Sequence, residues 1–156
     1  MTIISSFVFG AIGVSAPLMT IYLQELGASF SRISLILTSY AAILMLSNYG
    51  WGRISDWVGR RKPLIAGGLL SMSITVALLS RVPNDEWAWG VRILEGVSLA
   101  AYNTTSLALM GDLLASAGKR GQKIGLFRGI GSFAFAVGAL MGGGLPIYIQ
   151  QVMRYC

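Results

Sequence analysis

Histidine is absent from this 156-residue sequence, and cysteine occurs once, at the last position, Cys156. A zinc centre built from cysteine and histidine therefore cannot be assembled, and neither can a disulfide within the chain. Without histidine there is also no Ser-His-Asp set, and the few carboxylates are scattered along the chain. We expect no enzyme activity, no metal site and no cofactor.

Charge is scarce as well: charged residues make up 12% of the chain and hydrophobic residues 54%, where a soluble domain has about 25% charge. This composition excludes an ordinary water-soluble domain. A membrane-spanning helix needs about 20 mostly apolar residues, and five such runs occur, at about 1–23, 33–51, 64–80, 87–110 and 124–145. The sequence predicts an all-α membrane protein, a bundle of about five transmembrane helices over 1–145, followed by a short, truncated tail at 146–156.

The basic residues gather between the apolar runs. Seven lie in the second and fourth connectors (Arg53, Arg60, Arg61, Lys62, Lys119, Arg120 and Lys123), against three on the opposite side (Arg32, Arg81 and Arg154). By the positive-inside rule, both basic connectors and the N-terminus are cytoplasmic. We therefore interpret the net charge of +6 as an orientation signal. We expect a multi-pass protein of the plasma membrane in contact with lipid, and no nucleic acid partner.

The fourth apolar run contains two charged residues, Arg92 and Glu95, one helical turn apart. Gly96, Asn103 and Ser106 fall on the same helical face. A charge at the bilayer centre costs about 2.5 to 3.5 kcal/mol, so such residues usually face a partner or a water-filled pathway. We predict a substrate or proton pathway here, with Arg92, Glu95, Asn103 and Tyr102 as candidate residues. The alternative is a structural Arg92/Glu95 pair near the outer interface.

Small residues recur at steps of three and four in several runs. The clearest sets are Ser6, Gly10, Gly13, Pro17, Thr20 and Gln24 in the first run, and Gly125, Gly129, Ser132, Ala136, Ala139 and Gly143 in the fifth, with Gly138 and Gly142 as a GxxxG step. Small residues let helix backbones approach closely in lipid. These stripes predict helix contacts inside the bundle.

The second connector reads Gly-Arg-Ile-Ser-Asp-Trp-Val-Gly-Arg-Arg-Lys-Pro from Gly52. It closely resembles the cytoplasmic loop signature of the major facilitator superfamily, except that Trp57 stands where a basic residue is usual. Arg92-Ile-Leu-Glu-Gly96 is similar to the family's fourth-span signature, and Asp112 followed by basic residues resembles its acid-then-basic pattern after that span. The fifth-span Gly-Pro-x-x-Gly-Gly signature of drug/proton antiporters is not matched, because Pro146 lies too late.

The resemblance implies the N-terminal part of a secondary active transporter that moves a small solute. It implies a gating loop in which an acid latches the two halves together, here formed by Gly52, Asp56, Gly59, Arg60, Arg61, Asp112 and Arg120, with Arg60 or Arg61 as the positive partner of Asp56. It also implies that Arg92 is associated with the central cavity and, in proton-coupled members, with proton movement, so proton or ion coupling is an open expectation. Because the family is usually built from two six-span halves, we expect a missing C-terminal half, in the same chain or in a second one. The alternative is a non-transporting remnant or an assembly subunit of a split transporter.

Overall fold

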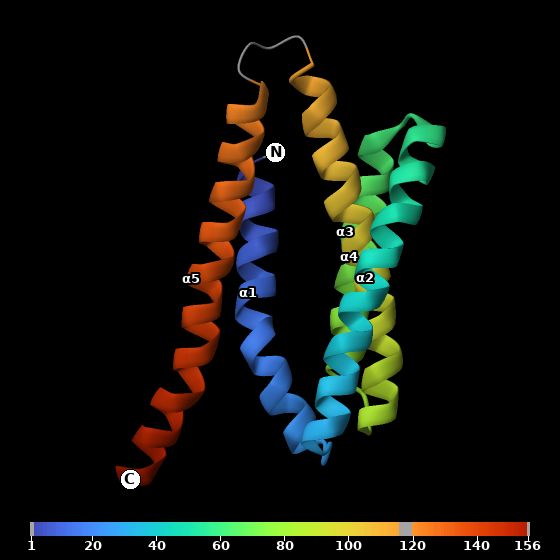
Figure 1. Cartoon of the computed structure of the whole chain (residues 1–156). Coiled ribbons are helices and arrows are strands. Elements are labelled where there is room, and N and C mark those ends of the chain that lie inside the picture. The colour runs from blue at the N-terminus through green and yellow to red at the C-terminus, as the bar shows by residue number, and fades with distance from the viewer. Residues whose placement is uncertain (1, 116–119, 156) are drawn as a thin grey trace. The chain divides into compact units, whose positions relative to one another are not determined.

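A computed structural model describes the backbone of residues 2–115 and 120–155 and the side chains of residues 3–115 and 121–144. The described part contains five helices and no strand: α1 (Thr2–Glu25), α2 (Phe30–Val58), α3 (Arg61–Leu79), α4 (Asp85–Leu113) and α5 (Arg120–Tyr155) (Figure 1). The predicted all-α class is confirmed.

Four of these helices are long and apolar enough to cross a membrane, namely Ile3–Glu25, Phe30–Val58, Arg61–Leu79 and Gly121–Gly144. The remaining expected span, the fourth apolar run, corresponds to α4, which is 29 residues long and does not reach the same apolarity. Its first turn carries Asp85 and Glu86, and Arg92 and Glu95 follow within the helix. Among α2, α3 and α4, most of the buried residues belong to α4. Because its side chains are covered by the neighbouring helices, α4 can carry charged groups that a lipid-facing helix would not tolerate.

The chain divides into two compact units. One comprises Met1–Tyr22 and Lys119–Cys156, and therefore most of α1 with α5. The other comprises Leu23–Gly118, with α2, α3 and α4. Each unit is described by itself.

In the α2–α4 unit, local signals set the helix ends. Ser29 caps α2 by accepting a hydrogen bond from the Arg32 backbone N–H, and Asn84 caps α4 by accepting one from the Trp87 backbone N–H at 3.0 Å. Gly59 ends α2 in the left-handed conformation, with φ of 65°, which glycine adopts without a steric cost. The turn from α2 to α3 is therefore very short.

The position of Gly59 corrects one boundary. The charged stretch that begins at Arg53 was expected to be a loop, but α2 continues through it to Val58. Asp56 therefore lies in the last turn of a helix, and Lys62 in the first turn of the next one. The reason is that nothing between Arg53 and Val58 breaks a helix before Gly59 supplies the αL residue.

Helix α4 is the centre of its unit, because it packs against both α2 and α3, which contact each other little. Its buried residues include Ala88, Leu99, Ala100 and Tyr102. The backbones of α3 and α4 come close at Gly68, where an added Cβ would lie 3.0 Å from the backbone nitrogen of Tyr102. Small residues thus permit the close packing that membrane helices need.

In the α1–α5 unit, glycines bring the two backbones into contact. A Cβ on Gly13 would overlap the carbonyl oxygen of Phe135, and a Cβ on Gly138 or Gly142 would overlap a carbonyl oxygen of α1. The predicted GxxxG step therefore forms the helix contact.

The prediction that the face with Gly125, Gly129 and Gly143 also forms a helix contact is mostly wrong. An added Cβ on Gly125 or Gly129 would meet nothing within 4 Å, and on Gly143 it would only reach Pro17 at 4.0 Å. Both faces of α5 are rich in small residues, so composition left the contacting one open. Beyond the predicted span, the tail at 146–155 continues α5 to Tyr155.

Candidate functional site

Arg92 and Glu95 form an ion pair inside the α2–α4 unit. Nη1 of Arg92 donates to Oε2 of Glu95 at 2.7 Å. The side chains are only 10% and 8% exposed. Both residues lie on α4, one turn apart. Because the partners are three residues apart, helix geometry alone brings them together, and this contact is compatible with both the predicted pathway and the alternative of a structural pair.

Several buried polar atoms of α4, one of them in Arg92 itself, have no hydrogen-bond partner among the described residues. They are Arg92 Nε, Asn103 Oδ1, Thr105 Oγ1 and Ser106 Oγ. Asn103 follows Arg92 by three turns on the same helical face, as predicted. Tyr102 is 2% exposed, and its backbone lies against Gly68 of α3, so it belongs to another side of α4 than Arg92.

Tyr40 is the residue at this site that the sequence pattern did not single out. Cζ of Arg92 lies 4.1 Å from the centroid of the Tyr40 ring, so α2 provides a cation–π partner for the guanidinium. A polar contact also joins these helices nearer the other end, where Thr104 Oγ1 donates to Asn48 Oδ1 at 2.8 Å. A signal for Tyr40 existed: a charge in a span needs partners, and aromatic rings of neighbouring spans can supply them.

A second charged cluster lies where α2 ends, α3 begins and α4 ends. Arg61 donates through Nε to Asp112 Oδ2 at 2.5 Å and through Nη2 to Asp112 Oδ1 at 3.4 Å. It also donates to Ser55 Oγ at 3.0 Å and forms a pair with Asp56 Oδ1 at 3.4 Å. Of the two cations considered as the partner of Asp56, the structure selects Arg61. This Arg61 cluster links three helices through one guanidinium.

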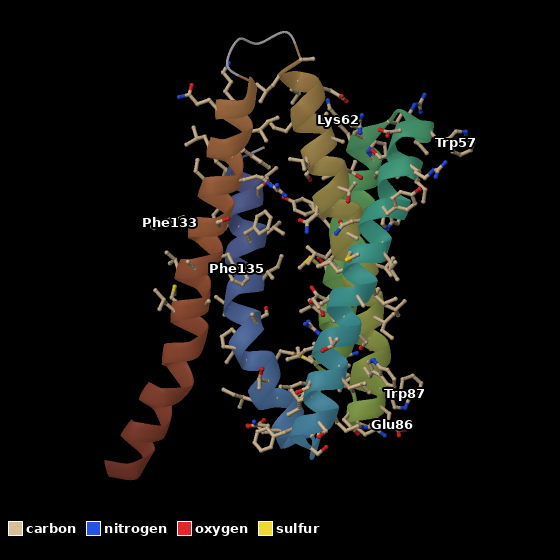
Figure 2. All side chains as sticks on the ribbon, viewed as in Figure 1. Trp57, Lys62, Glu86, Trp87, Phe133 and Phe135 are labelled. Atoms are coloured by element: carbon tan, nitrogen blue, oxygen red, sulfur yellow. The ribbon has the colours of Figure 1, made fainter. Side chains whose placement is uncertain are left out.

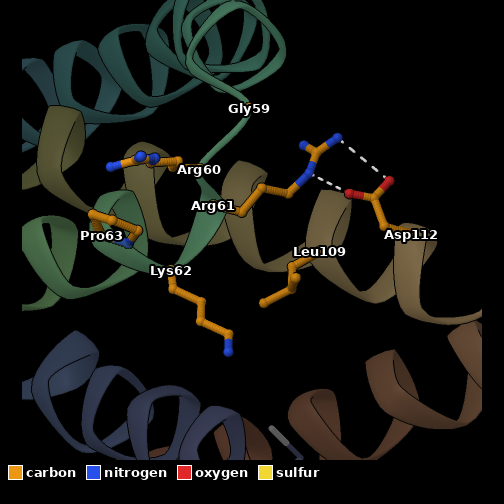
Figure 3. A pocket seen from close by; sticks show the side chains of 7 residues that line it. All are labelled: Gly59, Arg60, Arg61, Lys62, Pro63, Leu109 and Asp112. Carbon is orange, nitrogen blue, oxygen red and sulfur yellow. Dashed lines mark hydrogen bonds and ion pairs between the residues drawn. The ribbon is translucent and has the colours of Figure 1, made fainter.

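The Arg61 cluster borders a cavity of about 330 Å³ (Figure 3). The cavity is lined by Gly59, Arg60, Arg61, Lys62, Pro63, Leu109 and Asp112. Arg61 extends toward Asp112, whereas Arg60 points away from it (Figure 3). Arg60 therefore lines the same cavity without joining the ion pair with Asp112.

The remaining residues of the predicted gating loop have unequal roles. At Gly52 an added Cβ would lie 3.6 Å from Thr104 Cγ2, an ordinary contact, so α4 does pack against this glycine. Gly59 makes the turn, as described above. The side chain of Arg120 lies outside the described residues, and so does Lys119.

The opposite end of the same unit has its own ion pairs. Arg32 at the start of α2 contacts Asp85 Oδ2 at 3.0 Å and Glu86 Oε1 at 3.2 Å, both in the first turn of α4. Figure 2 shows Glu86 and Trp87 at this end and Trp57 and Lys62 at the other. Ion pairs thus tie α2 to α4 at one end and α3 to α4 at the other, with the buried Arg92/Glu95 pair between them in the sequence of α4.

Comparisons with known proteins identify the family of the chain. Residues 1–150 match the model of the Major Facilitator Superfamily. The chain is 31% identical over 137 residues to a puromycin resistance protein of Streptomyces alboniger, covering 85% of this chain and 26% of that protein. It is 30% identical over 152 residues to a multi-drug resistance efflux pump of Streptococcus pneumoniae, covering 94% of this chain and 36% of that protein.

A citrate exporter of Aspergillus niger is 27% identical over 126 residues, with 81% of this chain and 24% of that protein covered. No solved structure matches. The chain spans about a quarter to a little over a third of the length of these relatives. Because the family model covers nearly the whole sequence, this chain belongs to the Major Facilitator Superfamily and is an integral, multi-pass membrane protein.

Proposed function

We propose that the protein of which this chain forms a part is a secondary active transporter that exports a small organic solute across the plasma membrane. The relatives named above are described as a resistance protein, an efflux pump and an exporter, which supports transport over catalysis and supports the outward direction. The N-terminus is cytoplasmic in this proposal, since the basic connectors then lie inside.

The buried Arg92/Glu95 pair is the observation that carries the proposal. A buried ion pair adds little stability, because the cost of desolvating the two charges offsets most of their attraction. Hydrophobic residues of similar volume would stabilise the helix as well. Intramembrane ionisable residues are therefore usually found on a solute or ion pathway. The neighbouring buried polar atoms of Asn103 and Ser106 extend the same face. In this proposal, Arg92 and Glu95 line the pathway and exchange partners, or a proton, as the solute passes.

The Arg61 cluster is the gating element of the proposal. One guanidinium joins α2, α3 and α4 through Ser55, Asp56 and Asp112. The side chains of Asp56 and Asp112 are 74% and 59% exposed, so each ion pair to Arg61 is worth about 1 kcal/mol or less. Together the contacts bias a conformational equilibrium between states that differ by a similar free energy. Asp112 makes two of the contacts and Asp56 one, so Asp112 contributes more to the cluster.

The transport assignment is tested with the complete protein in inside-out membrane vesicles of a bacterial strain that lacks its own drug efflux pumps. The solutes are radiolabelled puromycin and citrate, and uptake is measured per amount of inserted protein. We expect saturable uptake of one of them, its loss in Arg92→Ala, and its retention in Arg53→Ala, a matched control on α2 whose exposed side chain bonds Tyr49. Uptake of neither solute by the parent protein, or full uptake by Arg92→Ala, would contradict the assignment.

The gating assignment is tested in the same vesicles with Asp112→Asn and Asp56→Asn. Both variants should insert normally and transport more slowly, with the larger decrease for Asp112→Asn because it loses two contacts to Arg61. Equal transport by both variants and the parent protein at equal abundance would remove the gating role from the Arg61 cluster.

A further inference from the structure

The Arg92 guanidinium has two different kinds of partner among the described residues. Its Nη1 bonds Glu95 on the same helix at 2.7 Å, and its Cζ lies 4.1 Å from the centroid of the Tyr40 ring on α2. The Nε atom of Arg92 is buried and has no hydrogen-bond partner in the described part of the chain. Among the described residues, the Tyr40 ring is therefore the partner of the Arg92 guanidinium that comes from another helix, α2.

The ring is seated against the α4 backbone, one turn beyond Arg92. A Cβ on Gly96 would lie 3.3 Å from Tyr40 Cδ2 and 3.4 Å from the Tyr40 carbonyl oxygen. Ile43, one turn further along α2, would approach it to 3.5 Å. The absence of a side chain at Gly96 thus lets the ring lie close to α4 and beneath the guanidinium.

We propose that Tyr40 is a positioning residue for Arg92, holding its guanidinium over the ring face so that it stays beside Glu95 within the unit. The role in transport rests on the function proposed above. A cation–π contact strengthens when the cation is removed from water, and the Arg92 side chain is 10% exposed. When Glu95 is protonated or binds the solute, Arg92 loses its counter-charge, and the Tyr40 ring still holds the guanidinium in place.

The interaction uses the face of the ring and not the hydroxyl group. The negative charge of the face comes from the π electrons, and phenylalanine has it as well. Phenylalanine at position 40 should therefore preserve the function, whereas an aliphatic residue of similar size should not. Fluorine atoms on the ring withdraw electrons from its face at almost constant shape, so they weaken the contact in steps.

The same helix offers a matched control. Arg53 lies 5.7 Å from the centroid of the Tyr49 ring, and Tyr49 is 70% exposed. This pair has the same residue types and a separation of four residues along α2, but it faces the surroundings. Tyr49→Leu should change nothing at Arg92, whereas a general weakening of α2 would show in both variants.

The first test reads the position of Arg92 directly. The 156-residue chain is reconstituted in lipid nanodiscs with ¹⁵N-labelled arginine, and the Nε–H resonance of Arg92 is assigned with Arg92→Lys. A group over an aromatic face is shifted upfield by the ring current, so we expect an upfield, slowly exchanging Arg92 resonance in the parent chain, Tyr40→Phe and Tyr49→Leu. In Tyr40→Leu the upfield shift and the protection should be lost.

If Tyr40→Leu does not fold, Phe, difluoro-Phe and trifluoro-Phe at position 40 decide the question. Exchange protection of Arg92 should fall stepwise with fluorination. An unchanged Arg92 resonance in Tyr40→Leu, or equal protection across the fluorinated series, would overturn the proposal.

The second test measures export by the complete protein. Tyr40→Leu should lower kcat by about tenfold, as expected for loss of a desolvated cation–π contact, with Tyr40→Phe close to the parent protein. Equal kcat values for the Leu and Phe variants would overturn the role in transport. If the parent protein exports no solute at all, the proposed function fails, while the resonance experiment still decides whether Tyr40 positions Arg92.

Discussion

Removing one partner of the buried Arg92/Glu95 pair should destabilise the protein far more than removing both. In Arg92→Met, the Glu95 side chain, 8% exposed, keeps its position without the donor that lies 2.7 Å away. Breaking a buried ion pair in this way costs about 3 to 5 kcal/mol, whereas replacing both partners by apolar residues of similar volume is close to neutral. We therefore expect about 4 kcal/mol for the single variant, close to a thousandfold in the unfolding constant.

The double variant Arg92→Met/Glu95→Leu should recover most of that stability. The measurement is reversible unfolding in mixed detergent micelles with increasing dodecyl sulfate, followed by tryptophan fluorescence. Trp89 is a suitable reporter, because its Nε1 donates to Ser39 Oγ at 2.7 Å across α2 and α4. Glu86→Gln is the control, since Glu86 is 73% exposed and pairs with Arg32 at the helix ends, and it should have a much smaller effect.

The reasoning would be refuted by either of two results. A loss below about 1 kcal/mol in Arg92→Met would show that Glu95 reaches water or another partner without cost. A double variant as unstable as the sum of both single variants would show that the two side chains contribute by packing and not as a pair.

Two further predictions concern helix packing and orientation. Gly138→Ala should separate α1 from α5 and cost about 1 to 3 kcal/mol, because its Cβ would overlap a backbone carbonyl, whereas Gly129→Ala has open space and should be neutral or slightly stabilising; equal unfolding midpoints would contradict the close contact. In a Cys156→Ser background, Pro83→Cys should react with an impermeant maleimide added to intact cells, and Trp57→Cys should react only after permeabilisation. The reverse labelling pattern would overturn the proposed orientation.

The class of the protein and its contacts within single helices could be predicted from the amino acids alone. Apolar runs of spanning length and the scarcity of charge predicted an all-α membrane protein, and the structure confirms the helices. The Arg92/Glu95 pair was also predictable, since residues three apart on a helix are neighbours whatever surrounds them. The turn at Gly59 obeys a similar local rule, because αL geometry at a helix end favours glycine, although the loop was expected to begin earlier, at Arg53.

The contacts between helices could not be predicted in this way, because they depend on how the helices pack. Arg61 bonds Asp112, 51 residues away, and Arg92 lies over the ring of Tyr40 on another helix. Such pairs depend on how each helix is rotated about its axis and how far it is shifted along its neighbour. In an apolar bundle, many rotations bury similar surface, so the hydrophobic pattern does not select one. Gly138 faces α1 and Gly129 does not, although both are glycines of the same helix, because only the packed backbones fix which side of α5 is the contact.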